Sequence, residues 1–316
     1  MFKKFSSFDN ITDKKEVENF LSRFPELNDP EREFIVWEKI DGSNFQLIFE
    51  LDKPNYTLGS RNETKSDSED HFGVRKVLDE KYPSLISSVR KMLNQEIQTI
   101  NLYGEIFGKS VLNRIDYQGP DIRFYYLRLN GIPVPPVDFL EFMSNIGFSF
   151  LSSPYEIIKG FNNAKAVDVE TESALLAPDA KRRIKEGVVI SDYREIFTSP
   201  IGNHFIFKKK SVNFREKEKR KIPKETNKNE MTLKLNEVFK TYINENRVLA
   251  MFSKQGKKIE SHKEIGYWVK LIIEDAKKEF DKDYQEELDS VPKNEIRSVY
   301  NIGSKLANIL IKQLES

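Results

Sequence analysis

The sequence predicts an α+β protein with an N-terminal domain of mainly antiparallel sheets and a C-terminal all-helical domain. Short runs of alternating or apolar residues, typical of strands, recur before residue 210. After Met231, apolar residues instead recur at helical spacing. The 316 residues, of which 38% are hydrophobic, exceed the usual size of one domain. We therefore expect two domains, residues 1–222 and 223–316.

The expected elements of the first domain begin with strands at residues 34–40 and 45–49. Asp41-Gly42 between them is a strong two-residue turn signal and predicts a β-hairpin. Further strands are expected at residues 56–60, 99–107, 122–129, 187–191 and 205–207. Helical periods occur at residues 84–95 and 137–145, and the second follows Pro135-Pro136, where proline is tolerated at a helix start.

A basic segment poor in apolar residues follows the last strand. Residues 215–228 carry seven basic and three acidic side chains and one proline, which is typical of a linker. The run could contact backbone phosphates of a nucleic acid, although charge runs are more often simply solvated. Beyond it, helical spacing of apolar residues predicts helices around residues 233–242, 265–273 and 302–310.

The composition excludes several kinds of site. The chain has no cysteine, and His71, His204 and His262 are too scattered for a zinc site, so any metal must bind oxygen ligands. The net charge of +1 means that affinity for nucleic acid would need a local basic patch. No apolar run approaches a membrane span, and the N-terminus lacks the apolar region of a secretory signal. We expect no membrane association and a cytoplasmic location, in the host cytoplasm if the protein is viral.

Lys39 is the most informative residue, because it ends an apolar run and begins a Lys-x-Asp-Gly motif. A lysine becomes a nucleophile only after losing its proton, which nearby positive charge or desolvation favours. Lys208 and Lys210 follow the strand at 205–207, and alternation places them on one face. They could hold a phosphate and supply that positive charge. A solvated strand end is the plainer alternative.

Three more charged residues stand at strand ends or within strands. Arg61 could clamp a phosphate, although an ordinary surface arginine is the simpler interpretation. Glu105 lies in an otherwise apolar strand, where a functional role and a structural ion pair are equally compatible with the sequence. Glu186 enters the strand at 187–191. The stretch 104–110 resembles a phosphate-binding P-loop but is one residue short between its glycines, so we reject that interpretation.

Taken together, these sites form an ordered set. They resemble motifs I, Ia, III, IV and V of the covalent nucleotidyltransferases, a superfamily of DNA ligases, RNA ligases and mRNA capping enzymes: Lys39-x-Asp41-Gly42, Ser60-Arg61, Tyr103-Gly104-Glu105, Glu186-Gly187 and Lys208-x-Lys210. Within it the chain is similar to the RNA ligase 2 family, also through Ile115-Asp116-Tyr117, Phe124-Tyr125 and Asn246-Arg247-Val248. The helical second domain favours an RNA ligase, because DNA ligases and capping enzymes carry a small β-barrel there.

The resemblance implies an ATP- and Mg²⁺-dependent enzyme that joins a 3′-hydroxyl to a 5′-phosphate at nicks in duplex RNA. Lys39 would form a lysyl-AMP, the AMP would move to the RNA 5′-phosphate, and the 3′-hydroxyl would then displace it. Sealing of DNA nicks or of single-stranded RNA, and a non-catalytic nucleic-acid-binding relative, remain open alternatives. No obligate protein partner is evident, and we expect a monomer.

The resemblance also implies a role for each site residue. Glu38 would accept the adenine amino group, Ile40 would line the nucleotide site, and Glu105 would bind the ribose hydroxyls. Glu186 would position Mg²⁺, Lys208 and Lys210 would hold the α-phosphate, and Arg61 and Asn44 would handle phosphate and the strand ends. The chain departs from the family in having Leu127-Arg128 for an adenine-stacking aromatic and an aspartate, Ser191 for a lysine, and Asp41 for a histidine.

Overall fold

The computed structural model describes residues 2–3, 8–108, 111, 114–215, 228–255, 259 and 264–315. The chain divides into two compact units, Met1–Asn213 with Lys254–Gly256, and Phe214–Ser253 with Lys257–Ser316. The expected boundary after residue 222, and nearly all of the expected linker at 215–228, lie outside the described residues.

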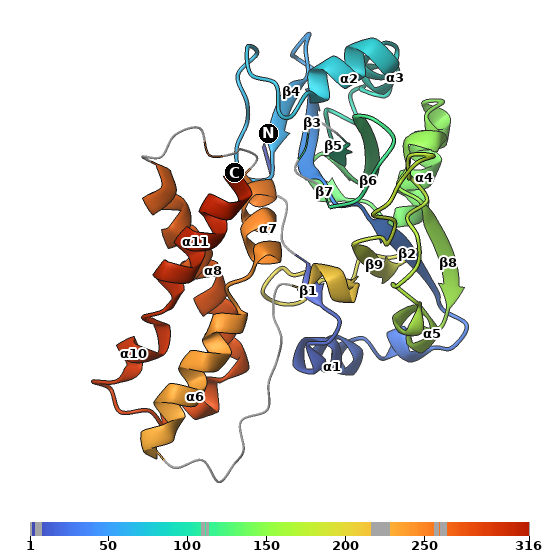
Figure 1. The fold of residues 1–316 in the computed structure, drawn as a ribbon. Coiled ribbons are helices and arrows are strands. Elements are labelled where there is room, and N and C mark those ends of the chain that lie inside the picture. Colours follow the sequence, from blue (N-terminus) through green and yellow to red (C-terminus); the bar gives the residue numbers. More distant parts are fainter. Residues whose placement is uncertain are drawn as a thin grey trace. The chain divides into compact units, whose positions relative to one another are not determined.

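Two five-stranded sheets form the centre of the first unit (Figure 1). One has the strand order β1 (Asp9–Asn10), β10 (Ile206–Lys210), β9 (Gly187–Asp192), β2 (Glu33–Lys39) and β8 (Tyr155–Lys159). The other has the order β4 (Thr57–Ser60), β3 (Ser43–Glu50), β5 (Thr99–Phe107), β6 (Asp121–Leu129) and β7 (Ile132–Pro133). Every pairing between these strands is antiparallel except that of β1 with β10. The predicted mainly antiparallel arrangement is confirmed.

The predicted hairpin around Asp41-Gly42 is wrong, because β2 and β3 belong to different sheets. Asp41 does not close a turn between paired strands; its backbone N–H instead donates to the hydroxyl of Tyr117, 2.8 Å away. A Cβ at Gly42 would lie 2.3 Å from the carbonyl oxygen of Ile106, so only glycine permits this path. The motif that begins at Lys39 therefore lies where the chain crosses from one sheet to the other.

Alternation along β2 divides its side chains between two cores. Ile35 and Trp37 join a cluster that contains residues of both sheets and of helices α2 (Val74–Lys81), α3 (Leu85–Arg90) and α4 (Pro136–Asn145). Phe34 and Val36 join a cluster on the opposite face, with α1 (Lys14–Arg23) and α5 (Phe161–Ala166). Short 3₁₀ turns complete the unit at η1 (Pro25–Asn28), η2 (Ser149–Leu151) and η3 (Val212–Phe214).

Most predicted elements of the first unit are confirmed. The strand expected at 99–107 is β5, and α4 begins with a proline in its first turn, as expected. The helix expected at 84–95 ends earlier, since the side chain of Asn94 accepts the N–H groups of Glu96 and Ile97 and forms a turn there. The strands β1 and β8 and the helices α1, α2 and α5 were not predicted.

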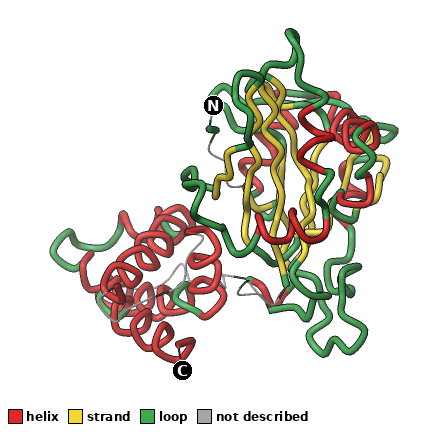
Figure 2. The backbone as a smooth tube through the Cα atoms, turned by 90° about the horizontal axis from the view of Figure 1, so that it is seen from above, coloured by secondary structure: helices red, strands yellow, loops and turns green. Residues whose placement is uncertain are grey.

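The described part of the second unit is helical (Figures 1 and 2), which confirms the predicted all-helical C-terminal region within those residues. Its helices are α6 (Lys228–Thr241), α7 (Glu245–Gln255), α8 (Ile265–Asp283), α9 (Gln285–Asp289), α10 (Ile296–Tyr300) and α11 (Gly303–Glu315). The guanidinium of Arg247 is fully buried, where it pairs with Asp275 and Glu279 of α8 and donates to the carbonyl of Tyr242.

Candidate active site

Three of the predicted residues meet at the ends of β2, β9 and β10. Lys39 lies opposite Gly187 on one side, and Lys210 lies opposite Gly187 on the other, so both flank Glu186. The Nζ of Lys39 donates to Oε2 of Glu186 at 2.6 Å, and the Nζ of Lys210 lies 2.9 Å from Oε1. One carboxylate is therefore held between two ammonium groups.

Gly187 makes this arrangement possible. A Cβ at this position would lie 2.0 Å from the carbonyl oxygen of Lys209, so a side chain would force β9 and β10 apart. The N–H of Ser211 donates to the carbonyl of Glu186 at 2.9 Å, which fixes the backbone beside the carboxylate. Glu186-Gly187 thus places the Glu186 carboxylate beside a point where the backbones of β9 and β10 are too close for a side chain.

Glu186 is ionised in this setting. Burial acts to raise its pKa, but the positive charges of Lys210, Lys39 and Arg114 outweigh burial and hold the pKa well below the usual value. An ionised carboxylate is only an acceptor, so it can exchange a lysine for a metal cation.

Lys208 lies on the same face of β10 as Lys210, as alternation predicts. Phe207, directly before Lys208, packs into the core on the other face of the sheet. Lys209 also points to that other face, where its Nζ donates to the carbonyls of Lys165 and Val167. The face opposite that core therefore carries Lys39, Lys208 and Lys210.

Glu105 comes from the second sheet, where it lies opposite Asn44 of β3. Burial raises its pKa from the ordinary 4.5 to about 8, although the charges of Lys39 and Arg61 act in the opposite direction. Within the described part of the chain it has no salt-bridge partner, so the structural ion pair that we considered is not observed there. At neutral pH much of Glu105 is a neutral acid that can both donate and accept hydrogen bonds.

Asn44 and Arg61 each present a buried polar atom without a partner among the described residues. The amide nitrogen of Asn44 donates to the hydroxyl of Tyr125, while its Oδ1 accepts nothing. The Nε of Arg61 is likewise buried and donates to nothing. Such groups are costly, about 1–3 kcal/mol each, and a ligand with hydroxyl and phosphate groups would satisfy both. The residues present therefore fit a nucleotide.

Leu127, predicted to contact the nucleotide, is buried in the core. A β-bulge opposite Tyr103 and Gly104 inserts one extra residue into β6. The side chains of Phe124 and Leu127, three residues apart, therefore point to the same face of the sheet. Both of those side chains enter the core cluster, and Leu127 is 1% exposed. The bulge instead turns Tyr125 and Tyr126 toward Ile206 of the first sheet. They line a cavity of about 30 Å³, together with Trp37, Val189 and Ser191.

The carboxylate of Glu38, expected to accept the adenine amino group, is hydrogen-bonded within the protein. Its carboxylate accepts the hydroxyl of Ser173 and the N–H of Ala174, the latter at 2.9 Å. Burial raises the pKa of Glu38, an effect that these hydrogen bonds reduce. Alternation places its side chain on the face of β2 opposite to that of Lys39. An adenine amino group would have to displace both bonds. Ile40 is buried at the end of β2.

Arg114 is a site residue that the sequence did not indicate. Its guanidinium lies 2.8 Å from Oδ1 of Asp41, and its charge lowers the pKa of Glu186. The family resemblance at residues 115–117 drew attention to this segment. No local pattern indicates a role for Arg114, because its partner Asp41 lies 73 residues earlier. The pair explains why an aspartate is accommodated at position 41.

Within the described residues, no group of three or more His, Asp or Glu side chains could hold a metal ion, and no helix could span a membrane. Glu186 is the carboxylate left for the predicted metal. Mg²⁺ often takes only one or two protein carboxylates and fills its remaining positions with phosphate oxygens and water. The single carboxylate of Glu186 is therefore compatible with a Mg²⁺ ion whose other ligands are nucleotide phosphate oxygens and water.

Two protein-family models match the chain. The RNA ligase family model matches residues 32–210, and the model of the T4 RNA ligase 2 C-terminal domain matches residues 225–309. A curated relative, Protein Early 65 kDa of Autographa californica nuclear polyhedrosis virus, is 29% identical over 133 residues, which make up 38% of this chain and 22% of that protein. The chain thus spans about a fifth of the length of that relative.

Solved structures of an RNA ligase from Naegleria gruberi also resemble the chain. A mutant with AMP and Mn has a TM-score of 0.49 and 16% identity, and covers 67% of this chain and 57% of that one. A mutant with ATP and Mn has a TM-score of 0.48, 16% identity and the same coverage. The match extends over little more than half of those ligases.

Proposed function

The chain belongs to the RNA ligase family, of the RNA ligase 2 type, and from this premise we propose that it seals nicks in duplex RNA with ATP. The reaction would pass through a lysyl-AMP on Lys39. The observation that carries the proposal is the cluster of Lys39, Glu186 and Lys210, in which a lysine that ends a strand shares one carboxylate with a second lysine. These are the groups that attack on a phosphate requires.

The first step makes and breaks one bond at phosphorus. After its ammonium has released a proton to solvent, the Nζ of Lys39 attacks the α-phosphate of ATP. An N–P bond forms, pyrophosphate leaves with the electron pair of the broken P–O bond, and the nitrogen releases a second proton to solvent. Lys208 and Lys210 lie on the same face as Lys39 and stabilise the negative charge on the phosphate oxygens. A 5′-phosphate oxygen of RNA then displaces Lys39, and the 3′-hydroxyl finally displaces AMP to form the phosphodiester.

The nucleotide would lie along the same face. Tyr125, rather than Leu127, presents an aromatic side chain to the cavity beside Trp37, which is two residues before Lys39 on β2, and so would cover the base. Glu105, largely protonated at neutral pH, can both donate to and accept from ribose hydroxyls. Asn44 Oδ1 and Arg61 Nε would complete their hydrogen bonds on sugar or phosphate groups.

Glu186 would hold the metal ion. When bound, Mg²⁺ neutralises phosphate charge and orients the leaving group. Oε2 of Glu186, which accepts from the Nζ of Lys39, is the carboxylate oxygen that would bind the cation. Lys210 keeps the carboxylate in place through its other oxygen.

A panel of nicked duplexes tests the substrate. The strands on either side of the nick carry ribose or deoxyribose, and each nick is offered to the wild type and to Lys39→Ala with ATP and Mg²⁺. We expect sealing where RNA flanks the nick and none by Lys39→Ala. Equal rates on all-DNA nicks would contradict the RNA assignment. Preference for unpaired RNA ends over nicks would contradict duplex recognition.

A further inference from the structure

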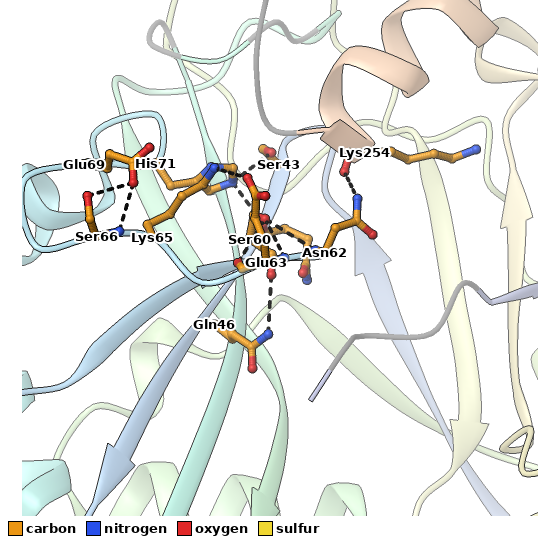
Figure 3. Close-up of polar contacts among 11 residues, drawn as sticks. Ser43, Gln46, Ser60, Asn62, Glu63, Lys65, Ser66, Glu69, His71 and Lys254 are labelled. Atoms are coloured by element: carbon orange, nitrogen blue, oxygen red, sulfur yellow. Dashed lines mark hydrogen bonds and ion pairs between the residues drawn. The ribbon is translucent and has the colours of Figure 1, made fainter. Parts of the chain in front are cut away.

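A buried histidine connects β3 with the loop that follows β4. His71 is 3% exposed, and its Nε2 lies 3.1 Å from the carbonyl oxygen of Asn44 and 3.2 Å from the hydroxyl of Ser43 (Figure 3). The loop begins with Arg61 and ends at His71 before α2. One end of this loop therefore carries Arg61, and the other end contacts the backbone of Asn44.

The chemistry of the contact assigns its direction. Burial lowers the pKa of His71 to about 4, so the imidazole is neutral at physiological pH and carries one N–H. A backbone carbonyl can only accept, so the hydrogen must be on Nε2. Nδ1 then bears a lone pair, and it is buried without a partner among the described residues. The one hydrogen of the ring is therefore directed at β3.

Other contacts shape the loop without touching Asn44. The N–H of Ser60 donates to the carbonyl of Glu63 at 2.8 Å, and the Nζ of Lys65 donates to the carboxylate of Glu63 at 2.6 Å (Figure 3). The N–H and hydroxyl of Ser66 donate to Glu69 at 2.9 and 2.8 Å. The turns of the loop are therefore stabilised by hydrogen bonds other than the one between His71 and Asn44.

We propose that His71 is a positioning residue: its Nε2–H bond to the Asn44 carbonyl fixes the start of β3, so that the Asn44 amide is held at the nucleotide site. In that position the amide donates to Tyr125 and leaves Oδ1 available to a ligand. The inference rests on the proposed function and concerns the steps that act on RNA ends, for which the family resemblance implies a role of Asn44.

The test uses a nicked RNA whose 5′ end is already adenylated, without ATP, so that the reaction begins after lysyl-AMP formation. Single-turnover sealing is measured for the wild type, His71→Phe, Asn44→Ala and the double variant. Loss of one well-placed hydrogen bond predicts a decrease of about tenfold for His71→Phe. Because His71 acts through Asn44, His71→Phe should cause no further decrease in the Asn44→Ala background.

One pair of variants and one control separate positioning from general stability. The amide nitrogen of His71→Gln can occupy the place of Nε2 and should restore sealing, whereas that of His71→Asn corresponds to Nδ1 and should not. This pair decides the question even if His71→Phe does not fold. Ser66→Ala removes a hydrogen bond of the same loop and should seal at the wild-type rate.

Three results would overturn the proposal: equal rates for His71→Gln and His71→Asn, an equal loss for Ser66→Ala, or independent effects of His71→Phe and Asn44→Ala. Failure of the wild type to seal the adenylated nick would instead contradict the proposed function. The two claims therefore fail through different results.

Discussion

The carboxylate of Asp41 is 5% exposed and lies 2.8 Å from the guanidinium of Arg114. Arg114→Gln would leave this buried charge without its partner, so we expect the free energy of unfolding to fall by about 3 kcal/mol. Urea unfolding measures the loss. The double variant Asp41→Asn/Arg114→Gln removes both charges and should recover most of it. A double variant as unstable as Arg114→Gln would contradict this account of the turn.

Glu105 gives a pH dependence with a definite sign. Its pKa of about 8 in the folded protein lies above the ordinary 4.5, so the protonated form stabilises the fold. That stabilisation is complete below the unfolded pKa and is lost as the pH rises through the folded one. Glu105→Gln does not titrate, so its stability relative to the wild type should increase between about pH 5 and about pH 9. A constant difference in urea unfolding would contradict the raised pKa.

Three of the residues singled out from the sequence lie together in the structure. Lys39, Glu186 and Lys210 stand at strand ends next to apolar runs, and the structure brings them together. Arg114 and His71 were not predicted as site residues, because their roles come from contacts with β3 and the turn before it, which are distant in the sequence. Glu38 is adjacent to Lys39, yet alternation turns its carboxylate toward Ser173.

At the scale of elements, the bulge in β6 is associated with Tyr125 facing the cavity while Leu127 lies in the core. Leu127→Ala should lower the free energy of unfolding by about 3 kcal/mol, because it opens a cavity in the core. Its KM for ATP in lysyl-AMP formation should stay near that of the wild type. Tyr125→Leu removes the aromatic ring at the cavity and should raise that KM with a smaller loss of stability. The opposite pattern would restore Leu127 as the residue that covers adenine.

The strands were predicted from alternation, but their partners were not. Asp41-Gly42 carries the composition of a hairpin turn. Composition does not reveal that the chain passes so close to Ile106 of β5 that a Cβ at Gly42 would lie 2.3 Å from its carbonyl oxygen. The bulge beside Tyr103 and Gly104 likewise has no sequence signal of its own in β6. One extra residue reverses every later side chain. The strand was therefore predictable, but the burial of Leu127 in the core was not.

At the scale of the whole molecule, each unit has its own core, and Arg247 is the buried charge of the second. Arg247→Met removes the buried guanidinium that pairs with Asp275 and Glu279 and should destabilise that unit by about 3 kcal/mol. Hydrogen exchange should increase in α7 and α8 while β5 stays protected. Lys270→Met, which removes an exposed ion pair with Glu274, serves as the control. It should change neither the stability of the second unit nor its hydrogen exchange. Equal deprotection of β5 would show that the units do not unfold separately.

The division into a mixed unit and a helical unit was predictable, because the hydrophobic period changes from that of strands to that of helices after Met231. The residue at which the first unit ends could not be predicted, because the charged run at residues 215–228 gives no signal for where one core stops. The family assignment depended on the order of motifs along the chain, which no single motif supplies.

The most direct test of the account is covalent transfer from α-labelled ATP. The protein is incubated with the nucleotide and Mg²⁺, denatured and digested, and the labelled peptide is identified by mass, beside Lys39→Ala and with excess GTP as competitor. We predict AMP on the peptide that contains Lys39, no label in Lys39→Ala, and resistance to GTP. Label that persists in Lys39→Ala would contradict the central claim. So would unlabelled wild type whose intact mass also shows no AMP already bound.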